Sequence, residues 1–424
     1  MKIKCRDLDY AAAAALPPEP HTQPRKTAPV VRALLKALSA PELRKVNFRW
    51  EQEGMERLGK DESALFLMNH SSFIDLKIAS TILYPRPFNI VCTSDGFVGK
   101  KAVMYRLGCI PTKKFITDTT LVRDMLYAVN TLHSSILMYP EASYSFDGTA
   151  TPLPESLGKC LKLLKVPVVM IRTYGAFARD PLYNMLQLRD VPVSAKMTYL
   201  LSPEDIKEKS AAELNAILKE QFTFDNFRWQ QENGVKITEP FRADGLNRVL
   251  YKCPVCGKEG EMEGKGTALR CRSCGSVWEL TEEGTLRSEG GKETFTHVPD
   301  WYAWERECVR KELEEGSYLL DVPVQIRMLV NFDSIYNVGT GRLRHDGNGF
   351  HLTGCDGALD YVHAPAQSYS LYSDYFWYEL GDMICIGDSR ALYYCFPTEG
   401  GDIVAKTRLA AEELYRMKRP GAGR

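Results

Sequence analysis

A histidine and an aspartate five positions apart are the first residues of this sequence that could do acid–base chemistry. His70 follows the apolar run Ala64–Met68, and Asp75 stands at the start of a helical pattern. Five steps of a regular helix would place the two side chains roughly 140° apart, so they meet only if strand changes to helix between them. In that geometry Asp75 would bind one imidazole nitrogen, which leaves the other nitrogen to act as a base.

A capping role would explain the aspartate without any catalysis. Ser72 and Asp75, three positions apart, form a serviceable capping box at the start of a helix. The chain has seven histidines, so an aspartate five positions after one of them arises by accident about one time in three. The spacing alone leaves both interpretations open.

Four of the twelve cysteines form a second group, with the spacing of a metal site. Each of the pairs Cys253/Cys256 and Cys271/Cys274 has two intervening residues, and fourteen residues separate the pairs. This pattern predicts a closed zinc ribbon whose four thiolates leave no coordination position for a substrate. Free thiols or a redox pair are the alternative. Because no basic stripe accompanies the cysteines, we expect a structural or protein-contact role and no nucleic-acid partner.

The elements that must position His70 and Asp75 form an alternating pattern, which predicts an α/β unit with a largely parallel sheet. The expected strands are Ala64–Met68, Phe88–Cys92, Ser135–Tyr139, Val166–Arg172 and Val193–Leu200. The expected helices are Ser72–Leu83, Thr119–Leu132, Glu155–Leu164, Ala211–Phe222 and Asp225–Glu232. Ligands gather at the carboxyl ends of parallel strands, so the segments 69–75 and 140–143 are expected to share one edge of the sheet.

Composition and charge exclude several classes of protein. The 424 residues carry 54 basic and 54 acidic side chains and are 44% hydrophobic, as in a globular chain of two to four domains. The longest apolar runs, such as Val166–Ile171, are far shorter than the roughly 20 residues that cross a bilayer. The polar start of the chain lacks the apolar stretch of a secretion signal. We therefore expect a cytoplasmic protein with reduced cysteines.

Four blocks of the sequence resemble the motifs of the glycerolipid acyltransferases, the lysophosphatidic acid and glycerol-3-phosphate acyltransferase superfamily. Asn69-His70-x4-Asp75 is similar to the first motif of that family. Tyr139–Gly148 resembles the family's Phe-Pro-Glu-Gly-Thr-Arg-Ser block, and Leu107–Lys114 and Val166–Val169 resemble the second and fourth blocks. The resemblance covers roughly residues 50–235, so the cysteine pairs and everything after them lie outside it.

The resemblance implies transfer of a fatty acyl group from acyl-CoA or acyl-carrier protein to a lipid hydroxyl, without an acyl-enzyme or a catalytic metal. His70 would deprotonate the acceptor, and Asp75 would orient His70 and stabilise its imidazolium form. Glu141 would position the glycerol backbone, while Lys113 or Lys114 would hold the phosphate. The substrate-binding residues that the resemblance implies are Asn69, Gly108, Lys113, Lys114, Glu141, Ala142 and Ser143.

Three departures from the family's pattern leave the acceptor open. Ala142 replaces the usual glycine, Ser143 replaces threonine, and Tyr144 stands where the family usually has arginine. A phenol cannot make the bidentate phosphate contacts of a guanidinium. Lysophosphatidic acid is the default acceptor, and glycerol 3-phosphate, another lysolipid or an amino-acid lipid are alternatives. A zinc-ribbon adaptor built on a degenerate acyltransferase is the non-enzyme alternative.

The segment between Arg25 and Arg49 has seven basic residues against a single acidic residue, Glu42. Its apolar residues Val30, Val31, Leu34, Leu35 and Leu38 follow helical spacing. Such a basic amphipathic helix can lie in the headgroup plane of an anionic membrane. Packing against the catalytic domain is the alternative. The expected location is the cytosolic face of a membrane, as a peripheral protein.

The chain is expected to divide into four regions. These are residues 1–48 with the basic helix, an acyltransferase domain over 49–245, a zinc ribbon over 246–285, and a linker helix with a β-rich domain over 286–424. The last region contains a helix at Pro299–Glu315, strands from Tyr318 to Phe396 and a final helix at Ile403–Met417. About seven strands closed by a helix resemble the pleckstrin-homology-like superfold, an analogy that says little about function.

Overall fold

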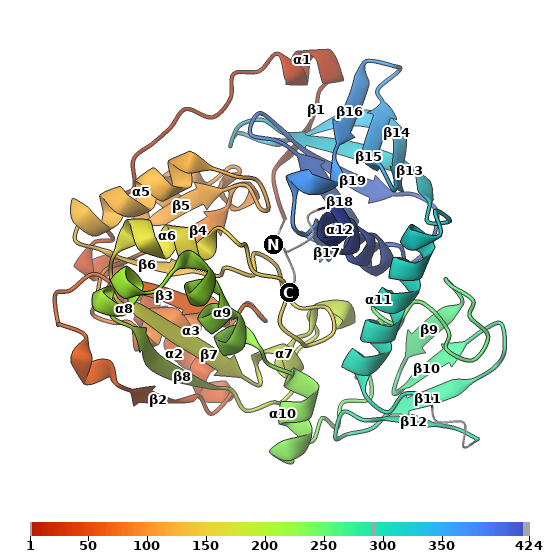
Figure 1. Cartoon of the computed structure of the whole chain (residues 1–424), viewed down its shortest axis with the longest axis horizontal. Coiled ribbons are helices and arrows are strands. Elements are labelled where there is room, and N and C mark those ends of the chain that lie inside the picture. Colours follow the sequence, from red (N-terminus) through yellow and green to blue (C-terminus); the bar gives the residue numbers. More distant parts are fainter. Residues whose placement is uncertain (1, 291–293, 419–424) are drawn as a thin grey trace.

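The computed structural model describes residues 2–290 and 294–418 (Figure 1). A seven-stranded sheet forms the centre of the N-terminal half, in the order β2-β8-β7-β3-β6-β4-β5. Its strands are β2 (Arg49–Glu53), β3 (Leu65–Met68), β4 (Phe88–Thr93), β5 (Cys109–Thr112), β6 (Ser135–Met138), β7 (Val168–Tyr174) and β8 (Ser194–Leu201). The five predicted strands are confirmed to within two residues.

The sheet is mixed. Strands β7, β3, β6, β4 and β5 are parallel to one another. Strand β8 runs antiparallel to β7 and pairs in parallel with β2. Two strands were not predicted: β2 is exposed along its whole length and has no apolar pattern, and β5 is an edge strand that contains Pro111.

Helices cover both faces of the sheet (Figure 1). The helices of this half are α2 (Pro29–Lys45), α3 (Asp75–Ile82), α4 (Lys101–Arg106), α5 (Thr119–Asn130), α6 (Leu157–Leu164), α7 (Ala176–Arg179), α8 (Pro203–Glu208), α9 (Ala211–Phe222) and α10 (Asn226–Glu232). Because side chains alternate along a strand, Phe66 and Met68 pack with α2 and α3, whereas Leu65 and Leu67 pack with α5, α6 and α9.

The four cysteines lie on a small four-stranded antiparallel sheet that follows α10. Its strands are β9 (Met262–Lys265), β10 (Ala268–Cys271), β11 (Val277–Leu280) and β12 (Leu286–Ser288), in the order β12-β11-β10-β9. We call this unit the cysteine ribbon. Helix α11 (Val298–Glu314) follows it and packs on it through Trp278 and Trp301, whose ring centroids are 4.9 Å apart.

A second large sheet occupies the C-terminal part. Its antiparallel strands are β13 (Leu320–Leu329), β14 (Ile335–Asp346), β15 (Gly349–Gly354), β16 (Leu359–His363), β17 (Tyr372–Trp377), β18 (Gly381–Gly387) and β19 (Leu392–Pro397). Their order is β16-β15-β14-β13-β19-β18-β17, and the helix α12 (Val404–Lys418) follows the last strand. We call β13–β19 and α12 the C-terminal β region. Its predicted strands and final helix are confirmed.

The amino-terminal segment is shared between the two halves. Strand β1 (Cys5–Asp7) pairs in parallel with β14, and the short helix α1 (Tyr10–Ala14) follows it. Further along, Glu19 accepts hydrogen bonds from the Phe332 backbone and the Lys101 side chain. The segment therefore ties the C-terminal β region to the first sheet before the chain reaches α2.

The C-terminal β region also packs directly on the N-terminal half. One continuous core contains Phe146 and Phe177 of the first half, Trp278 of the ribbon and Leu409 of α12. Eleven of the fifteen residues of α12 are buried, so this helix lies inside the molecule and not on its surface.

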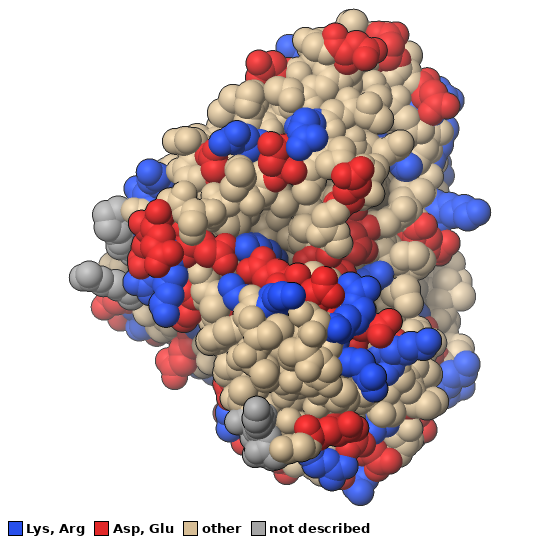
Figure 2. Space-filling model, turned by 90° about the vertical axis from the view of Figure 1, so that its right-hand side faces the viewer, with Lys and Arg blue, Asp and Glu red and all other residues tan. Residues whose placement is uncertain are grey.

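Acidic and basic side chains alternate over the face that carries α11 and the ribbon (Figure 2). Arg306 of α11 contacts Glu412 and Glu413, and Arg310 contacts Glu314. On this face the described residues form no continuous basic surface of the kind that nucleic acid requires. Among the described helices, none combines the length and the apolar composition that a membrane span needs.

Candidate active site and cysteine cluster

His70 and Asp75 meet where the first strand of the motif turns into a helix. Strand β3 ends at Met68 and α3 begins at Asp75, so helix does not start at Ser72 as predicted. His70 Nδ1 lies 3.1 Å from Asp75 Oδ2. The same oxygen accepts the backbone N–H groups of Ser71 (2.9 Å) and Ser72 (3.1 Å). The carboxylate thus fixes the turn and the imidazole together, and Nε2 is the nitrogen left to act as a base.

Two tyrosines hold the imidazole ring between them. The ring centroids of Tyr139 and Tyr144 each lie 4.3 Å from that of His70, at interplanar angles of 30° and 34°. Burial raises the pKa of both phenols well above its ordinary value, so both stay neutral at physiological pH. The His70 side chain is 22% exposed. Tyr144, which replaces the family's arginine, therefore acts here as part of an aromatic clamp on the imidazole.

Glu141 lies directly behind His70 and is 4% exposed. Its Oε2 accepts the backbone N–H of His70 at 3.0 Å, and its Oε1 accepts that of Thr151 at 2.8 Å. Both carboxylate oxygens are therefore bound to the protein backbone. Burial raises the pKa of Glu141 to about 7, and the two N–H donors and the Arg408 cation oppose that rise.

The other residues implied in this block also contact protein groups. Asn69 Oδ1 accepts the Thr173 N–H at 2.8 Å and so fastens the end of β3 to β7. Ala142 has a φ of 56°, a left-handed conformation that favours glycine. The Ser143 hydroxyl accepts a hydrogen bond of 2.8 Å from Arg408. We call residues 139–151 the glutamate loop.

The two lysines of the second block point to the C-terminal β region. Lys113 Nζ donates to the Ser389 carbonyl, and Lys114 Nζ lies 4.1 Å from the centroid of the Tyr372 ring. Burial lowers the pKa of each ammonium group. Gly108, earlier in this block, has a φ of 78°, and a Cβ there would lie 2.4 Å from Thr27 Oγ1. Only glycine fits this position, because the backbone is left-handed and Thr27 occupies the space of a Cβ.

A comparison with protein families identifies this part of the chain. Residues 49–173 match the family model described as Acyltransferase. This segment, less than half of the chain, is therefore similar to the acyltransferase family. We call the matched segment the acyltransferase domain, and it contains His70, Asp75 and the whole glutamate loop. The protein is accordingly an acyl-transferring enzyme.

The other comparisons add little. No curated protein sequence matches the chain. Among solved structures, the 1-acyl-sn-glycerophosphate (LPA) acyltransferase PlsC from Thermotoga maritima is similar, with 15% identity and a TM-score of 0.34. That match covers 45% of this chain and 78% of the other. A TM-score of this size is too low to establish a shared fold. The assignment of residues 49–173 therefore depends on their match to the family model.

Two contacts of the acyltransferase site were not predicted from the sequence. The aromatic clamp had a weak signal, because Tyr139 and Tyr144 flank the Pro-Glu-Ala-Ser segment. The contact between Arg408 and Ser143 joins residues 265 positions apart and had no local signal.

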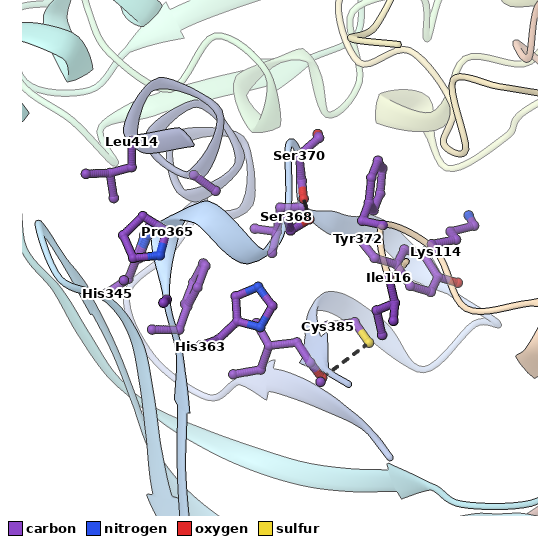
Figure 3. Close-up of a pocket in the computed structure, with 18 of the residues that line it drawn as sticks. Lys114, Ile116, His345, His363, Pro365, Ser368, Ser370, Tyr372, Cys385 and Leu414 are labelled. Carbon is purple, nitrogen blue, oxygen red and sulfur yellow. Dashed lines mark hydrogen bonds between the residues drawn. The ribbon is translucent and has the colours of Figure 1, made fainter. Parts of the chain in front are cut away.

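A cavity lies beside the acyltransferase domain, between the Lys114–Ile116 loop and the C-terminal β region (Figure 3). Most of its lining is apolar, and His345 and His363 are its two imidazoles. Burial lowers the pKa of His345 to about 3 and also lowers that of His363, so both rings are neutral. His70 is not part of the lining. The cavity is therefore a mainly apolar seam and not the catalytic centre.

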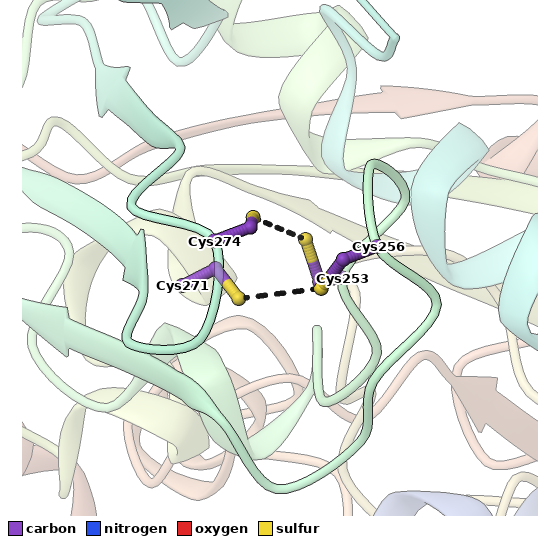
Figure 4. A group of neighbouring side chains, drawn as sticks. All are labelled: Cys253, Cys256, Cys271 and Cys274. Carbon is purple, nitrogen blue, oxygen red and sulfur yellow. Dashed lines mark hydrogen bonds between the residues drawn. The ribbon is translucent and has the colours of Figure 1, made fainter.

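The four ribbon cysteines converge as the sequence predicted (Figure 4). Their sulfur atoms all lie within 4.8 Å of one another, and the Cys253–Cys274 and Cys256–Cys271 distances are 3.7 Å. Disulfide sulfurs would be about 2.05 Å apart, whereas a zinc tetrahedron with Zn–S bonds of about 2.3 Å has edges of about 3.8 Å. The donor set fits zinc, which stays a prediction. Cys253 and Cys271 are buried, so the site is integral to the ribbon core.

The cysteine cluster predicts one zinc ion per chain. We expect Cys271→Ser to lose the metal and to lower the unfolding temperature, because the ribbon core and the Trp278–Trp301 contact depend on the cluster. Metal analysis by mass spectrometry and thermal melts measure both. Cys308→Ser, outside the cluster, serves as control and should keep the zinc. A wild-type protein without zinc would contradict the prediction.

The buried carboxyl of Glu141 predicts a pH dependence of stability. Its folded pKa of about 7 lies above the ordinary 4.5, so the folded state holds an extra proton between these values. The free energy of unfolding should therefore fall as pH rises through this window, by up to about 3 kcal/mol. The Glu141→Gln variant has no carboxyl at this position, so its free energy of unfolding should not show this fall. Urea unfolding of both proteins at pH 5 and 7.5 measures the difference, and a difference that does not change with pH would refute the prediction.

Proposed function

We propose that the protein is a lysophospholipid acyltransferase, similar to 1-acylglycerol-3-phosphate O-acyltransferases, that acts in phospholipid biosynthesis. Acyl-CoA or acyl-carrier protein would donate the acyl group. The observation that carries the proposal is the His70–Asp75 pair at 3.1 Å within an acyltransferase domain, with Nε2 left as a base.

The mechanism follows from this pair. His70 Nε2 takes the proton of the acceptor hydroxyl as its oxygen attacks the thioester carbonyl. The tetrahedral intermediate collapses, an ester bond forms, the C–S bond breaks, and the imidazolium returns its proton to the leaving thiolate. Asp75 stabilises the imidazolium through Nδ1, as the aspartate of a serine-hydrolase triad does. Tyr139 and Tyr144 keep the ring in one orientation throughout.

The charges around Lys114 favour a second candidate acceptor. Asp95 and Asp374 face this lysine, so carboxyl groups from both halves of the protein offset its positive charge in part. Tyr144 adds no cation. An acceptor whose headgroup carries an amine, such as an amino-acid lipid, would suit such a site better than a phosphate monoester. Lysophosphatidic acid and an amine-bearing lysolipid offered together in one assay would separate the two candidates.

Loss of the base should abolish acyl transfer. We expect His70→Ala to lower kcat by about 10³-fold with acyl-CoA and lysophosphatidic acid, since a general base contributes about 10²–10⁴-fold. Thiol release and mass spectrometry of the lipid product measure the reaction. His351→Ala is the control, because His351 is an exposed histidine of β15 that pairs with Asp360. Thiol release that persists undiminished in His70→Ala would refute the mechanism.

We further propose that α2 brings the site to an anionic membrane from the cytosolic side. Val30, Leu34 and Leu38 form one line along the helix and are 75%, 57% and 65% exposed. Phe73 and Leu76 are also exposed, and Phe73 contacts the Tyr144 ring at 5.6 Å. Helix α2 packs on α3, which begins just after Phe73, so the two groups of exposed apolar residues lie on neighbouring elements. Exposed basic residues flank the line: Arg25, Lys26, Lys36, Arg44 and Lys45.

Charge placed on this line should weaken membrane binding. We expect the double variant Leu34→Asp/Leu38→Asp to bind phosphatidylglycerol vesicles at least about tenfold more weakly, because it loses apolar burial and gains repulsion. Vesicle sedimentation measures the binding. Val362→Asp on β16 is the matched control, since Val362 is 61% exposed. Point substitutions are preferable to removal of residues 1–45, because β1 pairs with β14. Unchanged binding by the double variant would refute the proposal.

A further inference from the structure

Arg408 of α12 reaches the glutamate loop from the far end of the chain. Its Nη2 donates to Ser143 Oγ at 2.8 Å, and its Nη1 lies 3.4 Å from the Tyr144 carbonyl oxygen. The guanidinium also covers the Phe146 ring, at 4.5 Å from the centroid. Arg408 and Ser143 are each 3% exposed. This side chain is therefore a buried cation that binds the loop at three successive points.

The guanidinium is held in place by a buried carboxylate. Arg408 Nε lies 3.3 Å from Glu412 Oε1, which also accepts a hydrogen bond of 2.7 Å from Ser370. The other oxygen of Glu412 accepts 2.7 Å from Arg306 of α11. Arg306 also contacts Glu413, so two arginines and two glutamates form this buried network. The network fixes the Arg408 guanidinium with its Nη atoms directed at the glutamate loop.

Two of the loop residues that Arg408 contacts or faces, Tyr144 and Glu141, contact His70 in turn. Tyr144 lies against the imidazole, with ring centroids 4.3 Å apart. Glu141 accepts the His70 backbone N–H, and the Arg408 cation favours the ionised form of this carboxyl. The motif that this loop resembles has an arginine where this chain has Tyr144. Here a cation, Arg408 of α12, reaches the same loop from another part of the chain.

We propose that Arg408 is a positioning residue of the acyltransferase site, which supplies from the C-terminal β region the cation that the glutamate loop lacks at position 144. The inference builds on the proposed function. Through Ser143 and Tyr144 it keeps the imidazole clamped, and its charge favours the ionised form of Glu141 behind His70. The C-terminal β region is therefore part of the catalytic unit.

Three variants on one helix test the proposal. Arg408→Gln removes the positive charge and the planar set of guanidinium N–H donors. Arg408→Lys keeps the charge but loses that planar set of donors. Arg416→Gln is the matched control, because Arg416 lies on α12, contacts Glu413 and is remote from the loop. Zinc content and thermal melts establish that each variant is folded. We expect Arg408→Gln to lower kcat by about 10²-fold with KM for acyl-CoA within about threefold, as a misplaced base would.

The pH profile separates a positioning role from a merely structural one. Glu141 is faced by His70 and Thr151 in the acyltransferase site, by Arg408 of α12 and by Tyr369 of the C-terminal β region. Loss of the Arg408 charge leaves the carboxyl protonated to higher pH. The acid limb of kcat/KM should therefore move to higher pH in Arg408→Gln and should stay in place in Arg408→Lys and Arg416→Gln.

A measurement without substrate tests the clamp independently of acyl transfer. Diethylpyrocarbonate modifies accessible imidazoles, and peptide mass spectrometry gives the rate at His70. We expect this rate to rise at least about threefold in Arg408→Gln and to stay unchanged in Arg416→Gln. If the wild type transfers no acyl group but the His70 rate still rises, the proposed function fails and the positioning role stands. Wild-type kcat and an unchanged His70 rate in Arg408→Gln, beside an inactive His70→Ala, would overturn the inference alone.

Discussion

The site depends on one carboxylate oxygen that is almost completely buried. Asp75 is 1% exposed, and its Oδ2 receives the imidazole and two backbone N–H groups. Burial of an ionised carboxyl is costly unless hydrogen bonds replace its water. The requirement for those donors forces the chain into a tight turn between β3 and α3. That turn fixes His70, so the position of the proposed base and the local folding share one physical cause.

A second buried carboxyl, that of Glu141, binds the backbone of the same histidine. Glu141 accepts the His70 N–H and connects it to Thr151 at the far end of the glutamate loop. The loop itself is held by Arg408, and Phe146 packs on Tyr375 of β17 at a centroid distance of 4.6 Å. The imidazole is therefore positioned by successive layers of contacts, the outermost of which belong to the C-terminal β region.

This arrangement brings residues far beyond the acyltransferase domain into contact with the glutamate loop. The buried network of Arg306, Arg408 and Glu412 has to be complete, since an unpaired buried charge costs about 3–5 kcal/mol. The same region contacts Lys114, which the resemblance assigned to phosphate binding, through the Tyr372 ring. The C-terminal β region thus contacts both the glutamate loop and the second block of the motif.

The sequence by itself determined what local patterns encode. The alternation of strands and helices placed His70 after β3 and Glu141 after β6, and the spacing of Cys253 to Cys274 predicted their convergence. It also showed that the motif lacks an arginine at position 144.

Only the tertiary structure decided which distant groups complete the site. The reversed strands β8 and β2, the partners of Lys113 and Lys114, and the approach of Arg408 to Ser143 all arise from packing. Side chains hundreds of positions apart meet because two sheets bury a common core. No periodicity within a segment can record such a contact. The candidate site residues could therefore be identified from the sequence, whereas the contacts that hold them and the charges around them depend on the fold.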